Sequence, residues 1–499
     1  MAGGAPFIAH RSAGRAHGDP SLLSSIRRGV FWKAFSQVVW QASRVIVALL
    51  LARLLTPEQY GLAGMVLVFA SIVPLLADMA LGTAVIQRPM ITEQDRNTTF
   101  WMTVATGSVF TGLGVLSAGP IADFYHQPAV RPLFIALSLT FLITALGSTQ
   151  NALLIREMDF RGVELRMMIS TLVGAGAGLT VALLGGGAWA LIVQFLVGAA
   201  AATGLVWVYC RWRPGLSMSF ESFKKVGSYS SNVFGAHVFL QVDRNLDNLL
   251  VGRFIGSTAL GAYSLAYNVM LLPFSRIAGP LQEVLFPALS RIQDDVPRLA
   301  AAWLRGTRII AAVAMPCLLG LLILSQEFVD VVLGHKWDSA TRVIQILTWV
   351  GILHSLQQLN PTLLQARDRT GTLVRYSLVE FVASATAFVL GLHWGIVGVA
   401  TAYAIAITFV DPFYAWLSAR TVGLSLVDMA RALAGVFTAS SAMAVVVLLG
   451  RFLLIHYGTP AAARLVALAV VGGIAYVPLC AWRAPELRSE LRRLRSGSA

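Results

Sequence analysis

A stripe of polar side chains runs along the first long apolar segment of the chain. Its members are spaced so that they share one face of a helix: Lys33, Gln37, Gln41 and Arg44. A second apolar segment carries a stripe in the same register: His237, Gln241, Arg244 and Asn248. Asp243 and Asp247, one turn apart, widen that second face.

Charged groups at this depth in an apolar segment are costly, about 2.5–3.5 kcal/mol for each arginine or aspartate on insertion scales. They must therefore pair with one another or line a wet cavity. We interpret the two stripes as a cationic cavity wall that includes an ion-sensitive carboxylate. The alternative is a buried ion-pair network in which Arg244 bridges carboxylates. His237 could carry a proton, but a hydrogen-bonded structural histidine is the preferred interpretation.

The two stripes belong to an internal repeat of residues 37–61 and 237–261. The aligned copies share these identities: Val38/Val238, Gln41/Gln241, Arg44/Arg244, Leu49/Leu249, Leu50/Leu250, Arg53/Arg253 and Gly61/Gly261. A membrane protein with two similar halves is typical of transporters that hold their site between the halves. Other polar residues in counterpart helices extend the pattern: Asp78 in the second predicted helix, and Arg276 and Glu283 in the eighth. Glu380 and Asp411 are weaker candidates.

The composition is that of a polytopic membrane protein. The chain has 499 residues, 57% of them hydrophobic and 12% charged, with a mean hydropathy of +0.71. Soluble proteins carry about 25% charged residues. The net charge of +14 fits basic loops at the inner membrane surface better than nucleic-acid binding, so we expect membrane lipids and no nucleic acid as partners.

We predict an all-α integral membrane protein with about 14 transmembrane helices, forming two six-helix lobes around a central cavity plus a C-terminal helix pair. The spans are 30–54, 61–86, 98–119, 131–154, 165–184, 187–210, 227–253, 258–287, 303–327, 339–364, 373–392, 395–418, 429–450 and 461–482. A cytoplasmic N-terminus places most of the 38 lysines and arginines on the inner side, so both termini are expected to be cytoplasmic.

The predicted domains follow from the repeat and from the charged links between spans. They are a cytoplasmic N-terminal tail (1–29), an N-lobe of helices 1–6 (30–210), a cytoplasmic linker (211–226), a C-lobe of helices 7–12 (227–418), an extra helix pair (429–482) and a basic cytoplasmic tail (483–499).

Motifs for enzyme chemistry are missing from the sequence. The dipeptide Gly-Lys does not occur, so the chain has no phosphate-binding P-loop, and neither HExxH nor CxxC is present. The three cysteines lack the spacing of metal ligands. We therefore expect no catalytic residues, no metal and no cofactor, and we do not expect an enzyme.

Four segments resemble the polysaccharide-transporter branch of the multidrug/oligosaccharidyl-lipid/polysaccharide exporter superfamily: LLARLLTPEQYGLAGM, LADMALGTAVIQR, DNLLVGRFIGSTALGAYSLAYNVMLLP and LQEVLFPALSRIQDD. The resemblance covers about residues 25–425. It implies twelve core helices in two lobes, often with two extra helices. It also implies a flippase of the bacterial inner membrane that moves undecaprenyl-pyrophosphate-linked oligosaccharide for O-antigen or exopolysaccharide synthesis by alternating access.

With that substrate, Arg44 and Arg244 are the expected pyrophosphate ligands, because arginine binds phosphate through two parallel hydrogen bonds. Lys33 would guide entry from the cytoplasmic side. The other expected substrate-binding residues are Gln37, Gln41, Gln241 and Arg276. Asp78, Asp243 and Asp247 are the expected sites for a coupling proton or sodium ion.

Expected partners besides the lipid-linked oligosaccharide are a polysaccharide polymerase and chain-length proteins. Three alternatives stay open at this point. One is a multidrug/cation antiporter of the same superfamily, the second is a membrane-embedded polysaccharide polymerase or ligase, and the third is a peptidoglycan-precursor flippase.

Overall fold

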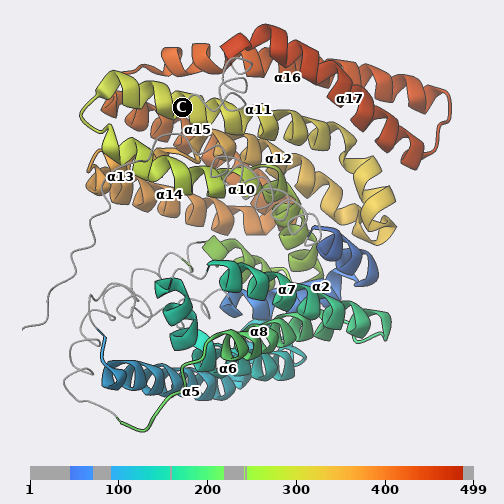
Figure 1. Ribbon diagram of the computed structural model, residues 1–499. Coiled ribbons are helices and arrows are strands. Elements are labelled where there is room, and N and C mark those ends of the chain that lie inside the picture. Colours follow the sequence, from blue (N-terminus) through green and yellow to red (C-terminus); the bar gives the residue numbers. More distant parts are fainter. Residues whose placement is uncertain (1–44, 71–90, 158–159, 218–240, 242–243, 487–499) are drawn as a thin grey trace, which may run out of the picture. The chain divides into compact units, whose positions relative to one another are not determined.

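The computed structural model describes residues 45–70, 91–157, 160–217, 241 and 244–486 of the chain. The described residues from Val47 onwards belong to one compact unit. Every regular element of the described part is a helix, and Figure 1 shows most of them labelled along the chain. The predicted all-α fold is therefore confirmed.

The helices of the described part have the following bounds. They are Val45–Leu54, α2 (Pro57–Ala70), α5 (Glu93–Tyr125), α6 (Val130–Arg156), α7 (Phe160–Leu183), α8 (Trp189–Tyr209), residues 244–254, α10 (Ser257–Arg291), α11 (Val296–Phe328), η1 (Val329–Leu333), η2 (His335–Trp337), α12 (Asp338–Gln357), α13 (Asn360–Ala366), α14 (Thr370–Gly391), η3 (Leu392–Trp394), α15 (Gly395–Thr421), α16 (Leu426–His456) and α17 (Ala461–Arg483).

Eight helical stretches of the described part are long and apolar enough to cross a membrane. They are α5, α6, Leu165–Leu183 of α7, α8, Val296–Leu333, Thr370–Thr421, α16 and α17. Thr370–Thr421 contains both α14 and α15, joined by the short helix η3. A multi-pass membrane protein is thus confirmed, and the total of fourteen spans stays a prediction.

Local sequence signals set the ends of several helices. Thr92 begins α5 with a capping box, because its hydroxyl accepts from the Asp95 backbone N–H at 3.1 Å while the Asp95 carboxylate accepts from the Thr92 N–H at 3.0 Å. Ser425 and Asp428 repeat this arrangement at the start of α16. Gly256 separates residues 244–254 from α10 with φ = 110°, a conformation that glycine adopts readily.

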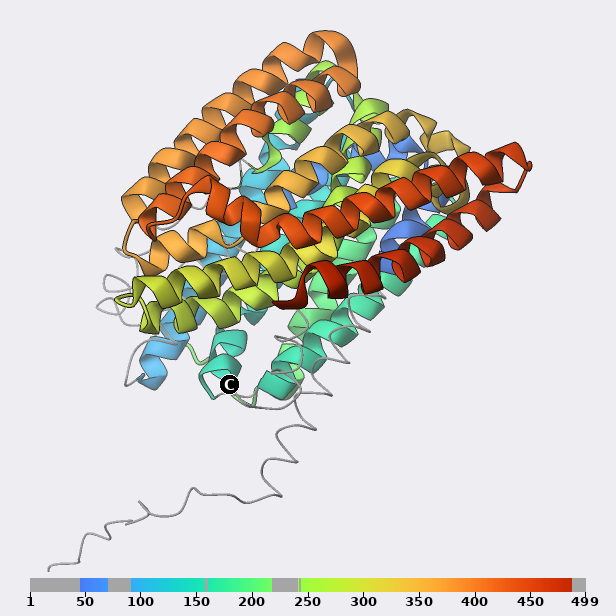
Figure 2. The ribbon, with the colours of Figure 1, turned by 90° about the horizontal axis from the view of Figure 1, so that it is seen from above.

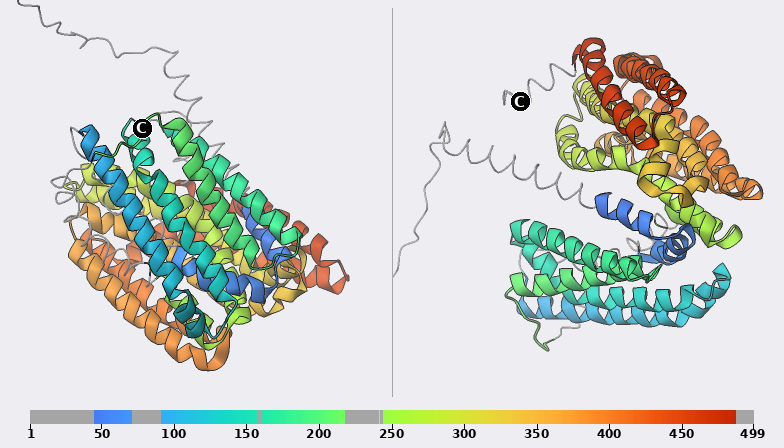
Figure 3. Two further views of the ribbon diagram at one scale, coloured as in Figure 1. Left: turned by 90° about the horizontal axis from the view of Figure 1, so that it is seen from below. Right: turned by 90° about the vertical axis from the view of Figure 1, so that its right-hand side faces the viewer.

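Helices α5 to α8 pack against one another through small residues. Helix α5 lies along α6, α7 lies along α8, and α6 also contacts α8 (Figure 3). A Cβ at Gly107 would press on Ala145, and a Cβ at Gly174 would press on Gly198 and on the Gln194 carbonyl. Such close approach of helix backbones is typical of membrane proteins, where lipid supplies no hydrophobic drive for association.

Helices α10 to α15 form a second packed group in which α12 contacts α10, α11 and α15. The predicted span 339–364 is divided here, since α12 ends at Gln357 and α13 begins at Asn360. Pro361, in the first turn of α13, has no N–H to continue the helical ladder. Asn360 at this break accepts a hydrogen bond from the buried indole of Trp303 at 3.2 Å.

Helices α16 and α17 form an antiparallel pair beside α11, seen in red next to the yellow helix in Figure 2. A fully buried carboxylate of α11, Glu327, joins the three helices. Its Oε1 atom lies 2.8 Å from Nε of Arg451 in α16 and 3.5 Å from Nε of Arg464 in α17. The pair is therefore attached by charge as well as by apolar contact.

The two copies of the repeat meet where α2 packs on α10. A Cβ on Gly61 would overlap the Ser257 carbonyl oxygen, and a Cβ on Gly261 would overlap the Pro57 carbonyl oxygen. Each glycine thus faces the first turn of the other helix, at positions that differ by the repeat offset. The contact is as close as two helix backbones allow only because neither position has a side chain.

Residues of η2 complete the C-terminal end of helix Val45–Leu54. The Trp337 indole N–H donates to the Ala52 carbonyl at 2.8 Å, and the Lys336 ammonium donates to the Arg53 carbonyl at 2.5 Å. Final carbonyls of a helix have no partner within the helix, and a cation at this end is also favoured by the helix dipole. Burial and the nearby Arg53 lower the pKa of Lys336 from its ordinary value.

Candidate functional site

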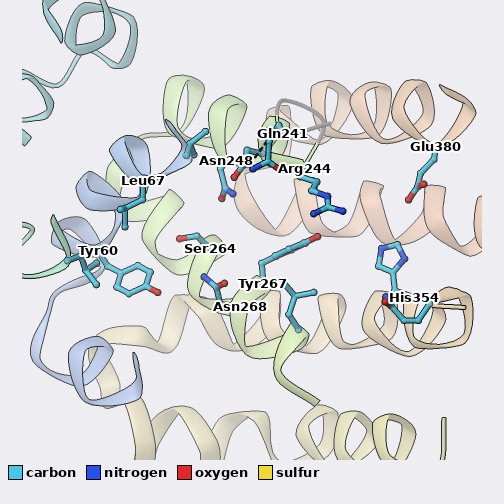
Figure 4. A pocket seen from close by; sticks show the side chains of 16 residues that line it. Tyr60, Leu67, Gln241, Arg244, Asn248, Ser264, Tyr267, Asn268, His354 and Glu380 are labelled. Carbon is cyan, nitrogen blue, oxygen red and sulfur yellow. Dashed lines mark hydrogen bonds between the residues drawn. The ribbon is translucent and has the colours of Figure 1, made fainter. Parts of the chain in front are cut away.

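A cavity of about 710 Å³ lies among helices from both halves of the sequence (Figure 4). Its walls come from α2, α8, α10, α12, α14 and the segment 241–254. The lining residues are Tyr60, Gly64, Leu67, Val68, Leu191, Gln241, Arg244, Asn245, Asn248, Ser264, Tyr267, Asn268, Leu271, His354, Gln358 and Glu380. The size lies within the usual range for ligand pockets, about 300–1,000 Å³.

Helical spacing explains which side chains reach the cavity. In the segment 241–254, the lining residues follow at three, four and seven positions after Gln241, which places them on one face. Helix α10 uses the same spacing, with Ser264, Tyr267, Asn268 and Leu271. Two neighbouring helices therefore present polar faces to a common space.

Helix α2 supplies a more apolar wall. Tyr60, Gly64, Leu67 and Val68 line the cavity from this helix. The Tyr60 ring lies against Trp337, with ring centroids 5.6 Å apart and the rings nearly perpendicular. This edge contact joins the cavity wall to the cap on helix Val45–Leu54.

Charged groups converge from the opposite side. Arg244, Tyr267, His354 and Glu380 point into the same part of the cavity in Figure 4. Arg244 is exposed although it lies in an apolar region of the chain. Behind His354 lies Asp411 of α15, whose side chain is 1% exposed. The cavity thus combines a solvent-accessible guanidinium with amides, hydroxyls, an imidazole and the carboxylate of Glu380.

Such a wall can bind an anion that also carries hydroxyl groups. A guanidinium donates two parallel hydrogen bonds to phosphate oxygens, and in a low-dielectric site these charge-assisted bonds are strong. Asparagine and glutamine amides both donate and accept, which suits the hydroxyl groups of a sugar. The described part of the cavity contains no arrangement of nucleophile and base.

The structure brings together some of the residues that the sequence predicted. Gln241 and Arg244 line the cavity, and Asn248 of the same stripe joins them. Asp247 is buried beside it, and its Oδ1 accepts from the Asn248 backbone N–H at 2.7 Å. Arg276 belongs to α10, but its side chain is not described. The following residues lie outside the described part: Lys33, Gln37, Gln41, Arg44, Asp78, His237 and Asp243.

Several lining residues were not predicted from the sequence. The sequence-based prediction did not include Tyr60, Tyr267, Asn268, His354 or Gln358. A signal was present, because the stretch HSLQQLN (354–360) interrupts an otherwise apolar segment with five polar side chains in seven residues. Polar side chains in a membrane segment face a cavity or a protein interior, so this stretch could have been included.

The fold and cavity are those of a membrane transporter with two helical halves. A model of the family described as "Polysaccharide biosynthesis protein" matches residues 50–342. The match covers more than half of the chain. The protein therefore belongs to this family of polysaccharide biosynthesis proteins.

Curated relatives carry related names. The lipopolysaccharide biosynthesis protein WzxC of Escherichia coli K12 is 29% identical over 74% of this chain and 76% of its own length. The teichuronic acid biosynthesis protein TuaB of Bacillus subtilis is 26% identical over 95% of this chain and 99% of its own length. The succinoglycan biosynthesis transport protein ExoT of Rhizobium meliloti is 26% identical over 94% of this chain and 95% of its own length.

Solved structures share the fold at low sequence identity. The lipid II flippase MurJ in an inward closed conformation superposes with a TM-score of 0.74 at 14% identity, covering 91% of this chain and 98% of that one. An inward-facing multidrug resistance transporter of the MATE family superposes with a TM-score of 0.63 at 13% identity, covering 77% of this chain and 94% of that one. The chain therefore shares the fold of these two transporters.

Proposed function

We propose that this protein is a flippase that moves a diphosphate-linked lipid oligosaccharide across the bacterial inner membrane during surface polysaccharide synthesis. The observation that carries the proposal is the exposed Arg244 in a cavity lined by amides and hydroxyls, inside a multi-pass helical fold. A diphosphate that enters a membrane must exchange its water shell for fixed cations, and arginine suits this exchange because its guanidinium is planar, always charged and weakly hydrated.

The names of the relatives support the proposal. WzxC and ExoT are named for lipopolysaccharide biosynthesis and succinoglycan transport, and a further relative from Haloferax volcanii is named as a probable glycan biosynthesis flippase. Each of these names refers to the biosynthesis of a glycan. The cavity of this chain fits such a ligand. Arg244 can donate hydrogen bonds to phosphate oxygens, and the amides of Asn245, Asn248 and Asn268 can donate to and accept from sugar hydroxyls.

The finer parts of the prediction remain part of this proposal. They include the cytoplasmic position of both termini, which rests on the distribution of lysines and arginines. They also include Arg44 as the counterpart of Arg244 in the first repeat, Lys33 at the entrance, and a coupling ion at the aspartates. Among those aspartates Asp247 has the best support, because it is buried in the helix that carries Arg244.

Reconstitution tests the proposal directly. The purified full chain is placed in liposomes with a fluorescent prenyl-diphosphoryl sugar, and transfer between leaflets is followed by a quencher that cannot cross the bilayer. We expect Arg244→Gln to slow transfer about tenfold or more, because hydrogen bonds to charged groups contribute about 1.5–3 kcal/mol. Arg342→Gln, an exposed arginine of α12 that does not line the cavity, is the matched control and should transfer at the wild-type rate.

Three outcomes would contradict the proposal. An unchanged transfer rate in Arg244→Gln would show that the cavity does not take part in transfer. Transport of a cationic dye that is equal or faster in Arg244→Gln, with no transfer of the diphosphoryl sugar by the wild type, would instead favour a cation antiporter. Elongation of glycans by the purified protein alone would favour a polymerase.

A further inference from the structure

Asp411 is a carboxylate in the middle of an apolar helical stretch. It belongs to α15, its side chain is 1% exposed, and the stretch Thr370–Thr421 is apolar enough to span a membrane. A buried carboxylate at such a position is stable only with a cation, a proton or several hydrogen-bond donors. The residues around it show which of these the structure provides.

Three side chains form a network with Asp411. The His354 Nδ1 atom lies 3.3 Å from Oδ2 of Asp411, and the Tyr376 hydroxyl donates to Oδ1 at 3.3 Å. The other ring nitrogen of His354, Nε2, lies 3.0 Å from the Tyr403 hydroxyl. Each nitrogen of the imidazole therefore faces one oxygen partner.

This geometry accommodates two protonation states without movement of heavy atoms. In the neutral imidazole, a proton on Nδ1 lies next to the Asp411 carboxylate while Nε2 accepts from the Tyr403 hydroxyl. In the imidazolium, both nitrogens donate, and the Tyr403 oxygen accepts after its O–H rotates. The ring can therefore gain or lose one proton while it keeps its hydrogen bond with Tyr403 and stays within ion-pair distance of the Asp411 carboxylate.

The network has access to the cavity through one of its members. His354 lines the cavity and its side chain is 16% exposed, whereas the Asp411 side chain lies behind it. Figure 4 shows the imidazole of His354 directed towards the space that Arg244 and Glu380 also face. A proton can thus pass between cavity water and the His354–Asp411 pair.

The charged and titratable groups around His354 come from four other helical segments. Asp411, Tyr403 and Tyr376 contact the network from α15 and α14, and Glu380 of α14 acts on His354 electrostatically. Arg244 and Tyr267 line the same cavity from the segment 241–254 and from α10. Asp247 of the former segment acts electrostatically on Tyr403.

An anion in the cavity changes the balance of these charges. A diphosphate beside Arg244 would neutralise the guanidinium, which leaves the carboxylates and the ligand's own negative charge to act on His354. Negative charge near an imidazole favours its charged form. Binding of the diphosphate should therefore draw a proton onto His354, and by linkage a proton on His354 should strengthen diphosphate binding.

We propose that His354 and Asp411 form a proton-binding pair whose occupancy is coupled to binding of a diphosphate in the adjoining cavity. This inference rests on the proposed function, and it adds a site that the stripe of aspartates in the segment 241–254 did not include. The role of Asp411 is to position and stabilise the imidazolium. His354 is the group that exchanges the proton with the cavity.

Calorimetry on the purified full chain in nanodiscs tests this proposal. The probe is farnesyl-diphosphoryl N-acetylglucosamine, a diphosphate diester with no group of its own that titrates near neutral pH. Binding is measured at neutral pH in buffers of different ionisation enthalpy, and the slope gives the number of protons taken up per probe bound. We expect measurable uptake by the wild type, and loss of most of it in His354→Gln and in Asp411→Asn while probe binding persists.

The variants are chosen so that folding and coupling can be separated. Glutamine at 354 offers both a donor for Asp411 and an acceptor for Tyr403, so this variant should fold even if Asp411→Asn does not. His335→Gln is the matched control, because the His335 side chain is 81% exposed and does not line the cavity. It should take up as many protons as the wild type.

The outcomes distinguish this inference from the proposed function. Probe binding with no proton uptake by the wild type, or with equal uptake in wild type, His354→Gln and control, would overturn the proton pair and leave the flippase proposal standing. Absence of probe binding by the wild type would overturn the proposed function itself. Sodium-dependent binding without proton uptake would assign the coupling to a metal ion instead and would also overturn the pair.

Discussion

Gly61 and Gly261 occupy equivalent positions of the two repeats, and each faces the backbone of the other's helix. The Cβ that Gly61 lacks would overlap the carbonyl of Ser257, while the Cβ that Gly261 lacks would overlap the carbonyl of Pro57. The contact is reciprocal, as expected when two duplicated elements pack around a pseudo-twofold axis. It also lies one turn from Gly64 and Ser264, which line the cavity.

Alanine at either glycine should loosen this contact. Gly61→Ala or Gly261→Ala places a methyl group where a backbone oxygen already lies, and overpacking of this kind costs about 1–3 kcal/mol. The apparent Tm of the purified protein should fall. Gly112→Ala in α5 is the control: no atom lies within 4 Å of its added Cβ, so the Tm should rise or stay the same. Equal Tm values in all four proteins would contradict the close contact.

Trp337→Phe tests how much the cap on helix Val45–Leu54 contributes to the stability of the protein. Phenylalanine can keep the edge contact with Tyr60, but it cannot donate to the Ala52 carbonyl. A buried acceptor left without a donor costs about 1–3 kcal/mol, so we expect a lower denaturation midpoint and faster hydrogen exchange near residue 56. Trp394→Phe serves as the control because the Trp394 side chain is 73% exposed, and a change above about 0.5 kcal/mol there would be unexpected.

The internal repeat predicted much of this fold. The register that matches Gly61 with Gly261 also matches Arg44 with Arg244, and Arg244 lines the cavity. The predicted spans coincide closely with α5 to α8 and with α14 and α15 because long apolar runs in a membrane leave the backbone no alternative to a helix. The counterpart cavity residues of the first repeat, and the domain boundaries, remain predictions.

Other parts of the site could not be predicted from the sequence. His354, Glu380 and Asp411 lie on three different helices, and only tertiary packing decides that their side chains meet. Asp411 and Glu380 are weak candidates in the sequence, and Glu380 alone resembles a carboxylate that reaches water from near the end of its predicted span. The cap by Trp337 is equally a long-range contact, because its acceptor lies 285 residues away in the chain.

Glu327→Gln should detach the pair α16–α17 from α11. The substitution leaves Arg451 and Arg464 without their shared counter-charge, and breaking a buried ion pair from one side typically costs about 3–5 kcal/mol. We expect a lower Tm and faster limited proteolysis between α15 and α16. Glu58→Gln, an exposed carboxylate of α2, should behave as wild type. Equal proteolysis of Glu327→Gln and Glu58→Gln would mean that the other contacts with α11, such as the hydrogen bond from Tyr476 to the Ala312 carbonyl, hold the pair without the Glu327 charge.

Arg244→Lys should separate the charge of the arginine from its shape. Lysine keeps the positive charge but loses the planar fork that binds two phosphate oxygens together. For a prenyl-diphosphoryl sugar we therefore expect affinity to decrease in the order wild type, Arg244→Lys, Arg244→Gln, with roughly a tenfold loss at the lysine step if one charge-assisted hydrogen bond is lost. For a prenyl-monophosphoryl sugar, which offers fewer phosphate oxygens, the wild type and the lysine variant should differ less. Calorimetry with the two probes measures both steps, and identical affinities for arginine and lysine with the diphosphate would show that Arg244 acts only as a diffuse charge in the cavity.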